Sequence, residues 1–171
     1  MLDHYISRLH ERCIVRLLLQ ANGSFFLSDR PAPTLLADGQ AMRIIVARSA
    51  QVRSSDPLLR HKTTLRQHFD KALKEARERG ADEAILLNEQ GECTEGSFTN
   101  LFVRMPGESI LRTPPLRCGL LPGVLRGLLL EEGWAREQVV LPRHLQQAEA
   151  LFIGNSARGL LPARLAENVA A

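Results

Sequence analysis

The polar segment TEGSFTNLF at residues 94–102 lies between two apolar segments and restricts the fold more than any other part of the chain. The apolar segments at 84–88 and 101–105 have the length and composition of buried strands. The polar segment supplies hydroxyl groups, an amide, the carboxylate of Glu95 and the backbone freedom of Gly96. Taken alone, it is more typical of a polar crossover between strands than of a functional loop. The rest of the chain therefore decides between the two interpretations.

The composition is that of a globular protein with one good core and a small appendage. Hydrophobic residues make up 44% of the 171 residues and charged residues 24%. The net charge is +3, but the basic residues are scattered, and there is one Trp and one Tyr. Nucleic-acid binding usually requires a basic cluster or interleaved aromatic residues, so we expect no nucleic-acid partner. A small anionic molecule fits the mild basic excess.

The cysteines and histidines do not predict a metal site. Cys13, Cys93 and Cys118 are odd in number and have no Cys-x-x-Cys spacing, and the histidines are not paired at ligand distances. Three single thiols suit a reducing compartment. No apolar run is long enough to cross a bilayer, and the first residues do not resemble a signal peptide. We therefore expect a cytoplasmic protein without a membrane partner.

Residues 1–36 are predicted to be the remnant of a small amino-terminal domain. A short amphipathic helix is expected within 1–12, followed by a hairpin of 14–19 and 25–27 around the Asn22-Gly23 turn. The proline-rich residues 31–34 are typical of a linker. A helix and one hairpin bury too little surface to be stable alone.

Residues 37–171 are predicted to form a large domain of the α/β (α+β) class with a barrel-like mixed sheet and flanking helices. A helix is expected from a capping box at Thr64, and the helical spacing continues to Ala76. Two more helices are expected at 124–133 and 144–148. The expected strands are 44–47, 84–87, 101–103, 109–111, 139–141 and 151–153.

Lys62 is the first candidate for chemistry, because it precedes this predicted helix. The positive end of a helix dipole and partial burial both push a lysine amine toward the neutral form. A neutral amine is required for covalent attachment to a carbonyl compound. An exposed lysine in a polar loop is the commoner alternative. Its neighbour His61 is given no role.

Two turns are candidates for binding a phosphate group. The segment PGVL at 122–125 places proline and glycine at the start of a helix, where free backbone N–H groups attract an anion. The segment GNS at 154–156 follows an apolar strand and offers small residues and exposed amides. A lysine, a carboxylate and two anion-binding turns are the components of a pyridoxal 5′-phosphate site.

A series of motifs makes this interpretation specific, because the chain resembles the class IV (fold-type IV) aminotransferases over about residues 41–165. Within that class it is most similar to the aminodeoxychorismate lyases, including versions fused to aminodeoxychorismate synthase. The motifs occur in the family order and are HKTT at 61–64, ADEA at 81–84, TEG at 94–96, TNLF at 99–102, TPPL at 113–116, CGLLPG at 118–123, AEA at 148–150 and GNS at 154–156.

The resemblance implies a role for Lys62 and Glu95. Lys62 matches the lysine that binds pyridoxal 5′-phosphate covalently and then moves the proton of the substrate Cα. Glu95 matches the carboxylate that faces the pyridine nitrogen of the cofactor. In the lyase, the enolpyruvyl group of aminodeoxychorismate is lost, and 4-aminobenzoate and pyruvate are released for folate synthesis.

The resemblance also implies which residues bind the phosphate group of the cofactor. Val124 and Leu125 match backbone positions at the phosphate, and Asn155 and Ser156 match a second phosphate turn. In the family the small domain supplies a phosphate-binding arginine, which has no identifiable counterpart here. Leu65 and Leu125 replace an asparagine and a hydroxyl residue that other members carry.

Two alternatives to the lyase stay open. One is an aminotransferase acting on D- or branched-chain amino acids. The other is a catalytically silent domain that binds the cofactor weakly or acts in dimerisation. The resemblance further implies a small-molecule substrate, a homodimer, and a link to aminodeoxychorismate synthase.

Overall fold

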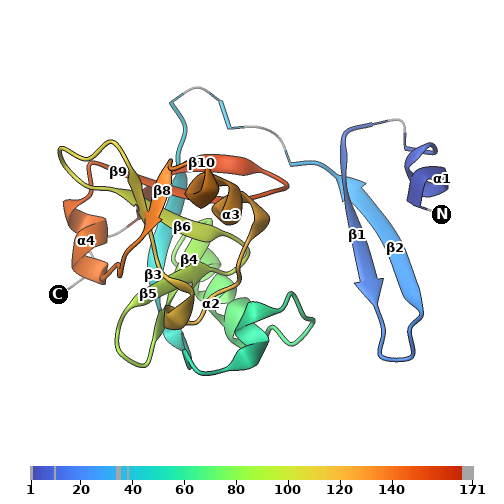
Figure 1. The fold of residues 1–171 in the computed structure, drawn as a ribbon, viewed down its shortest axis with the longest axis horizontal. Coiled ribbons are helices and arrows are strands. Elements are labelled where there is room, and N and C mark those ends of the chain that lie inside the picture. Colours follow the sequence, from blue (N-terminus) through green and yellow to red (C-terminus); the bar gives the residue numbers. More distant parts are fainter. Residues whose placement is uncertain (1, 10, 34–35, 38, 167–171) are drawn as a thin grey trace. The chain divides into compact units, whose positions relative to one another are not determined.

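The computed structural model describes residues 2–9, 11–33, 36–37 and 39–166 (Figure 1). The chain forms two compact units, Met1–Leu36 and Ala37–Ala171. The interpretation of the first unit as the remnant of a small domain stays a prediction.

The first unit is a short helix followed by the predicted hairpin. Helix α1 is Leu2–Ile6, which is shorter than expected, and strands β1 (Cys13–Leu19) and β2 (Phe25–Pro31) pair in antiparallel fashion. Gly23 has a φ of 82°, in the left-handed region that favours glycine, so the glycine of this turn is needed for its backbone conformation. Pro31 is the last residue of β2 and not part of a linker, and residue 34 lies outside the described residues.

The second unit contains a mixed eight-stranded sheet that closes on itself. The strands are β3 (Met42–Val52), β4 (Glu83–Asn88), β5 (Cys93–Gly96), β6 (Asn100–Arg104), β7 (Leu111–Thr113), β8 (Ala135–Glu137), β9 (Ala150–Asn155) and β10 (Gly159–Leu165). Their order is β5-β4-β3-β10-β9-β6-β7-β8, and the additional pairing of β5 with β6 closes a ring from which β7 and β8 extend. The predicted barrel-like mixed sheet is therefore confirmed.

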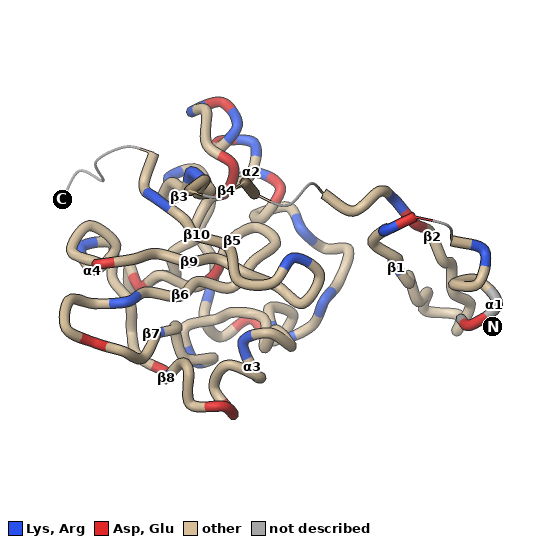
Figure 2. The backbone as a smooth tube through the Cα atoms, turned by 90° about the horizontal axis from the view of Figure 1, so that it is seen from above, with Lys and Arg blue, Asp and Glu red and all other residues tan. Residues whose placement is uncertain are grey.

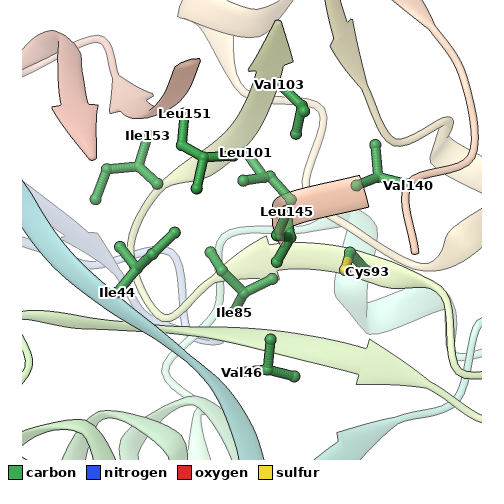
Figure 3. Close-up of a cluster of buried hydrophobic side chains, with 10 residues drawn as sticks. All are labelled: Ile44, Val46, Ile85, Cys93, Leu101, Val103, Val140, Leu145, Leu151 and Ile153. Atoms are coloured by element: carbon green, nitrogen blue, oxygen red, sulfur yellow. The ribbon is translucent and has the colours of Figure 1, made fainter. Parts of the chain in front are cut away.

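Apolar side chains from the ring strands fill the interior of this barrel, where they point toward one another (Figure 3). Ile44, Ile85, Leu101 and Ile153 are completely buried there. Because side chains alternate across a strand, the intervening residues of the same strands face outward and need a second covering layer.

Two helices supply the outer layer, and a third contributes to the interior. Helix α2 (Gln67–Glu78) covers β3 and β4 with its fully buried Ala72 and Ala76. Helix α3 (Val124–Glu131) contacts β8 and β9, and Leu129 packs with the outward-facing Phe102 of β6. Helix α4 (Pro142–Gln147) places Leu145 in the cluster of the barrel interior.

Several predictions about strands need correction, including the strand expected at 109–111, which lies at Leu111–Thr113. The segment 94–102 is not wholly a polar crossover, because β5 occupies its first part and β6 its last part. The strand expected at 139–141 lies at Ala135–Glu137 instead, where it can pair with β7. Strand β10 was not expected, and it joins β9 to β3.

Charged residues are distributed along the backbone of both units (Figure 2). No helix in the described part of the chain is long and apolar enough to span a membrane.

Candidate functional site

A cavity of about 380 Å³ opens in the second unit beside the end of β5. Its lining comes from four stretches within 56–69, 95–100, 121–124 and 155–156. The first stretch leads into the first turn of helix α2, and the second joins β5 to β6. The third leads into helix α3, and the fourth begins at the last residue of β9. Pockets for small molecules and cofactors usually measure about 300–1,000 Å³, so this cavity has the size of such a site.

The structure brings most of the predicted site residues together in this cavity. The lining includes Lys62, Glu95, Val124, Asn155 and Ser156. Leu125 is not part of it. A Cβ at Gly154 would touch the Cδ2 atom of Leu125, so the side chain of Leu125 packs on β9.

Lys62 lies on an irregular segment between the 3₁₀ helix Pro57–Arg60 and helix α2, and it is exposed. The helix predicted to begin at Thr64 begins at Gln67, and its cap residue Arg66 makes no side-chain capping bond. The predicted capping box is therefore wrong. Thr63 instead accepts a hydrogen bond from the N–H of Leu65, which holds the segment in a turn along the cavity.

Glu95 is a buried carboxylate with one strong hydrogen bond. The residue is 5% exposed, and its Oε1 atom accepts the backbone N–H of Leu121 at 3.0 Å. The Oε2 atom has only a 3.5 Å contact with Nδ2 of Asn100. Burial raises the pKa of Glu95 to about 8, against the lowering effects of the Leu121 N–H and the charges of Lys62 and Arg66. The carboxyl group can thus accept a further N–H donor from the cavity.

The turn at 97–99, which forms one wall of the cavity, is fixed by a second buried carboxylate that the sequence did not single out. Glu83 on β4 is completely buried and accepts hydrogen bonds from the Ser97 N–H, the Ser97 hydroxyl, the Phe98 N–H and the Thr99 hydroxyl. Burial raises the pKa of Glu83, and the hydrogen bonds from Ser97 act against this shift. The ADEA motif at 81–84 contained this residue, but nothing in its spacing indicated the contact.

Two further side chains hold the same turn from other elements. Arg66 donates from Nη2 to the carbonyl oxygen of Ser97 at 2.5 Å, and Asn155 donates from Nδ2 to the carbonyl oxygen of Phe98 at 2.9 Å. Asn155 also accepts the N–H groups of Ala157 and Arg158, so it shapes the turn that contains Ser156. The side chain of Asn155 is thereby engaged by the protein, and Ser156 is exposed at the cavity.

The amino-terminal end of α3 faces the cavity through Gly123 and Val124. Gly123 is the cap residue and has no side chain to bond the first N–H groups of the helix. A Cβ at this position would overlap Oδ1 of Asn100. The backbone can approach a ligand closely here, and the positive end of the helix dipole favours an anion.

Cationic side chains outnumber acidic ones around the cavity. Arg60, Lys62 and Arg66 line it together with Asp56 and Glu95. Apolar side chains also contribute to the lining, and Leu58, Leu65 and Val124 remain substantially exposed. The described residues contain no group of His, Cys, Asp and Glu side chains arranged to hold a metal ion.

Comparison with known proteins points to one family. The family described as amino-transferase class IV matches residues 2–166. A candidate branched-chain-amino-acid aminotransferase of Methanocaldococcus jannaschii is 31% identical over 138 residues, which are 77% of this chain and 46% of that protein.

Two solved structures are similar in fold. A candidate amino-acid aminotransferase from Mesorhizobium loti has 43% identity and a TM-score of 0.90, covering 96% of this chain and 78% of that one. A candidate 4-amino-4-deoxychorismate lyase from Legionella pneumophila has 24% identity and a TM-score of 0.71, covering 81% of this chain and 52% of that one. The chain spans less than half the length of the curated relatives it matches.

Proposed function

The chain belongs to the class IV aminotransferase family, and we propose that it transfers the amino group of an amino acid to a keto acid with pyridoxal 5′-phosphate as its cofactor. The observation that carries this proposal is that an exposed lysine, Lys62, and a buried carboxylate, Glu95, line the same cavity. Relatives named as branched-chain-amino-acid aminotransferases, at 31–33% identity, support an amino acid as the substrate. The exposed Leu58, Leu65 and Val124 at the cavity suit an apolar side chain.

The family depends on pyridoxal 5′-phosphate, and the residues of the cavity fit this group. Among the described residues, Oε2 of Glu95 has only the 3.5 Å contact with Asn100, so it can accept the pyridine N–H. The backbone at Gly123 leaves no room for a Cβ but exposes the start of α3, where a phosphate is favoured. When bound, the cofactor supplies the electron sink that takes up the electron pair left on the substrate Cα.

We propose that Lys62 is the catalytic residue. Its Nζ atom would hold the aldehyde group of the cofactor and, as a free amine, would accept the proton from the substrate Cα. The irregular segment at 61–66 leaves this amine at the cavity and accessible to a substrate. Arg60 and Arg66, on either side of Lys62 in the sequence, provide positive charge for the carboxylate of the substrate.

Glu95 is proposed to keep the pyridine nitrogen protonated. In the free protein its raised pKa means that the carboxyl group holds a proton near pH 7. A pyridinium N–H at Oε2 is an opposite charge in a buried place, so it would lower this pKa and favour the carboxylate. Hydrogen bonding by the Leu121 N–H fixes the orientation of the carboxyl group for that contact.

The phosphate is proposed to lie between the start of α3 and the turn after β9. The N–H groups of Val124 and Leu125 belong to the first turn of α3, which has no intrahelical acceptor for them. Ser156, which lines the cavity in the turn that Asn155 shapes, would contribute its hydroxyl. Leu125 contributes through its backbone, since its side chain packs on Gly154.

A second candidate function is that of 4-amino-4-deoxychorismate lyase. It is favoured by the ordered motif series and by the cationic side chains Arg60 and Arg66 at the cavity, because aminodeoxychorismate carries two carboxylates. The route would release 4-aminobenzoate for folate synthesis, with aminodeoxychorismate synthase supplying the substrate. The same lysine and carboxylate would serve both reactions.

For either activity, we propose that the protein is a homodimer and is located in the cytoplasm. The hairpin of the first unit exposes Leu17, Leu19 and Phe26. Exposed apolar groups of this kind support a partner surface, since small hairpins are not stable alone.

The test begins with cofactor binding. Protein mixed with pyridoxal 5′-phosphate should develop the visible absorbance of a cofactor bound covalently to lysine, and borohydride should fix the cofactor on the peptide containing Lys62. Lys62→Ala should abolish both signals, whereas Lys74→Ala on the exposed face of α2 should not. Unchanged absorbance in Lys62→Ala would refute the assignment of Lys62. Two activity assays then separate the reactions: an aminotransferase converts leucine with 2-oxoglutarate, and a lyase releases 4-aminobenzoate from aminodeoxychorismate. Cofactor binding without either activity points to a silent domain.

A further inference from the structure

Helix α3 carries a buried arginine in its first turn, a place where a positive charge is unfavourable. Arg126 is 3% exposed and is the third residue of the helix. The amino-terminal end of a helix carries the positive part of the helix dipole, and removing a guanidinium from water adds to the cost. A helix that only had to cover the sheet would be more stable with an apolar residue at this position.

Two acceptors on neighbouring strands hold this guanidinium. Nη2 of Arg126 donates to the carbonyl oxygen of Pro114, just after β7, at 2.9 Å and to Oε1 of Glu137, at the end of β8, at 2.5 Å. The salt bridge is asymmetric in exposure, because the Glu137 side chain is 45% exposed while that of Arg126 is 4% exposed. Glu137 therefore neutralises the charge of Arg126 only partly, since water screens the exposed carboxylate.

The remaining hydrogen-bonding capacity of the guanidinium is not used within the described residues. The Nε atom of Arg126 is buried and has no partner there, and the same holds for the Oγ1 atom of Thr113, next to Pro114 in the chain. An uncompensated buried donor is costly, so its presence needs an explanation.

From these contacts we infer that Arg126 is a positioning residue for the phosphate subsite, fixing the first turn of α3 to β7 and β8 and adding positive potential behind its free N–H groups. The inference rests on the proposed function, because it concerns the phosphate of the same cofactor. Arg126 does not line the cavity, so it acts through Gly123, Val124 and Leu125 rather than by touching the phosphate. It thereby supplies, from within the second unit, charge that favours a phosphate dianion at this helix end.

A comparison of two compounds that differ only in the phosphate tests this role. Dissociation constants for pyridoxal 5′-phosphate and for pyridoxal are measured by absorbance for the unaltered protein, Arg126→Met and Arg126→Lys. The matched control is Arg112→Met, which removes a partly buried arginine of β7 that is paired with Glu108.

Arg126→Met is expected to weaken pyridoxal 5′-phosphate about tenfold or more and pyridoxal by less than about twofold. Arg126→Lys, which keeps the charge but not the guanidinium geometry, should show the same selective loss to a smaller extent, and Arg112→Met should show none. If Arg126→Met does not fold, Arg126→Lys decides. An unchanged ratio of the two constants in Arg126→Lys, or an equal loss for both compounds, would overturn the positioning role. Failure of the unaltered protein to bind either compound would instead overturn the proposed function.

Discussion

Glu83 and Ser97, which are 14 residues apart in the sequence, are joined twice, because Oε1 of Glu83 accepts both the N–H of Ser97 at 2.8 Å and its hydroxyl at 2.6 Å. Oε2 accepts the Phe98 N–H and the Thr99 hydroxyl in addition. The turn that walls the cavity is thus organised around one carboxylate in the protein interior.

Removing this carboxylate should destabilise the second unit. Glu83→Ala leaves the Ser97 N–H and its neighbouring donors buried without an acceptor, and we expect a loss of about 3–5 kcal/mol in the free energy of unfolding. Glu83→Gln should also destabilise, since its amide N–H₂ group meets donors. Urea denaturation measures both, with the exposed Glu132→Gln as the control. A loss below about 1 kcal/mol for Glu83→Ala would contradict the role of this contact.

The raised pKa of Glu95 predicts a pH-dependent stability. Between its ordinary value of 4.5 and about 8, the folded cofactor-free protein holds a proton on Glu95 that the unfolded chain releases. The free energy of unfolding should therefore fall as pH rises through this window, by at most about 1.4 kcal/mol per pH unit from this group. Comparing urea unfolding at pH 5.5 and pH 7.5 in the unaltered protein and in Glu95→Gln isolates the effect. Equal slopes in the two proteins would show that Glu95 is ionised throughout.

Two glycines of the same region should respond in opposite ways to alanine. A Cβ at Gly123 would overlap Oδ1 of Asn100, so Gly123→Ala should cost about 1–3 kcal/mol and weaken cofactor binding. Gly127 lies in α3 with open space around it, so Gly127→Ala should stabilise by about 0.5–1 kcal/mol. Thermal unfolding with and without pyridoxal 5′-phosphate measures both changes. The prediction fails if Gly123→Ala binds the cofactor as the unaltered protein does.

We expect both the Nδ2 donor and the Oδ1 acceptor of Asn155 to stabilise the protein. Asn155→Ala removes the bond to the Phe98 carbonyl and the acceptor for the N–H groups of Ala157 and Arg158, at a cost of about 1–3 kcal/mol. Asn155→Asp keeps the acceptor and loses the donor, and it adds a negative charge beside the proposed phosphate subsite. Asn155→Asp should therefore bind pyridoxal 5′-phosphate more weakly than Asn155→Ala while unfolding at a higher urea concentration. The reverse order of affinities would argue against an anion near this turn.

The sequence predicted the residues that share the cavity better than it predicted how they are held. Lys62, Glu95 and Ser156 could be identified because short motifs carry them. The start of α2 could not, since Arg66 turns its guanidinium to the Ser97 carbonyl, 31 residues away, in place of a local cap. Glu83 was missed for the same reason, because its partners are distant in sequence.

The positions of some strands could not be predicted either, because they depend on pairing between residues far apart in the sequence. Strand β10 contains Pro162, which is unusual inside a sheet, and its parallel pairing with β3 joins residues more than 100 positions apart. The segment predicted as a strand at 139–141 contributes differently, since the carbonyl oxygen of Val140 accepts the N–H of Cys93 at the start of β5. The hydrophobic pattern indicated that this segment is buried, but it could not indicate which segment it contacts.

The barrel closes where β5 meets β6 at the register pair Glu95↔Asn100, and both of these side chains belong to the cavity. The seam of the closed sheet is therefore also part of the cavity wall. A molecule seated there would tie the two strands together, so occupancy should slow amide hydrogen exchange along the seam first. Without a ligand, local opening of the barrel should begin at the seam between β5 and β6.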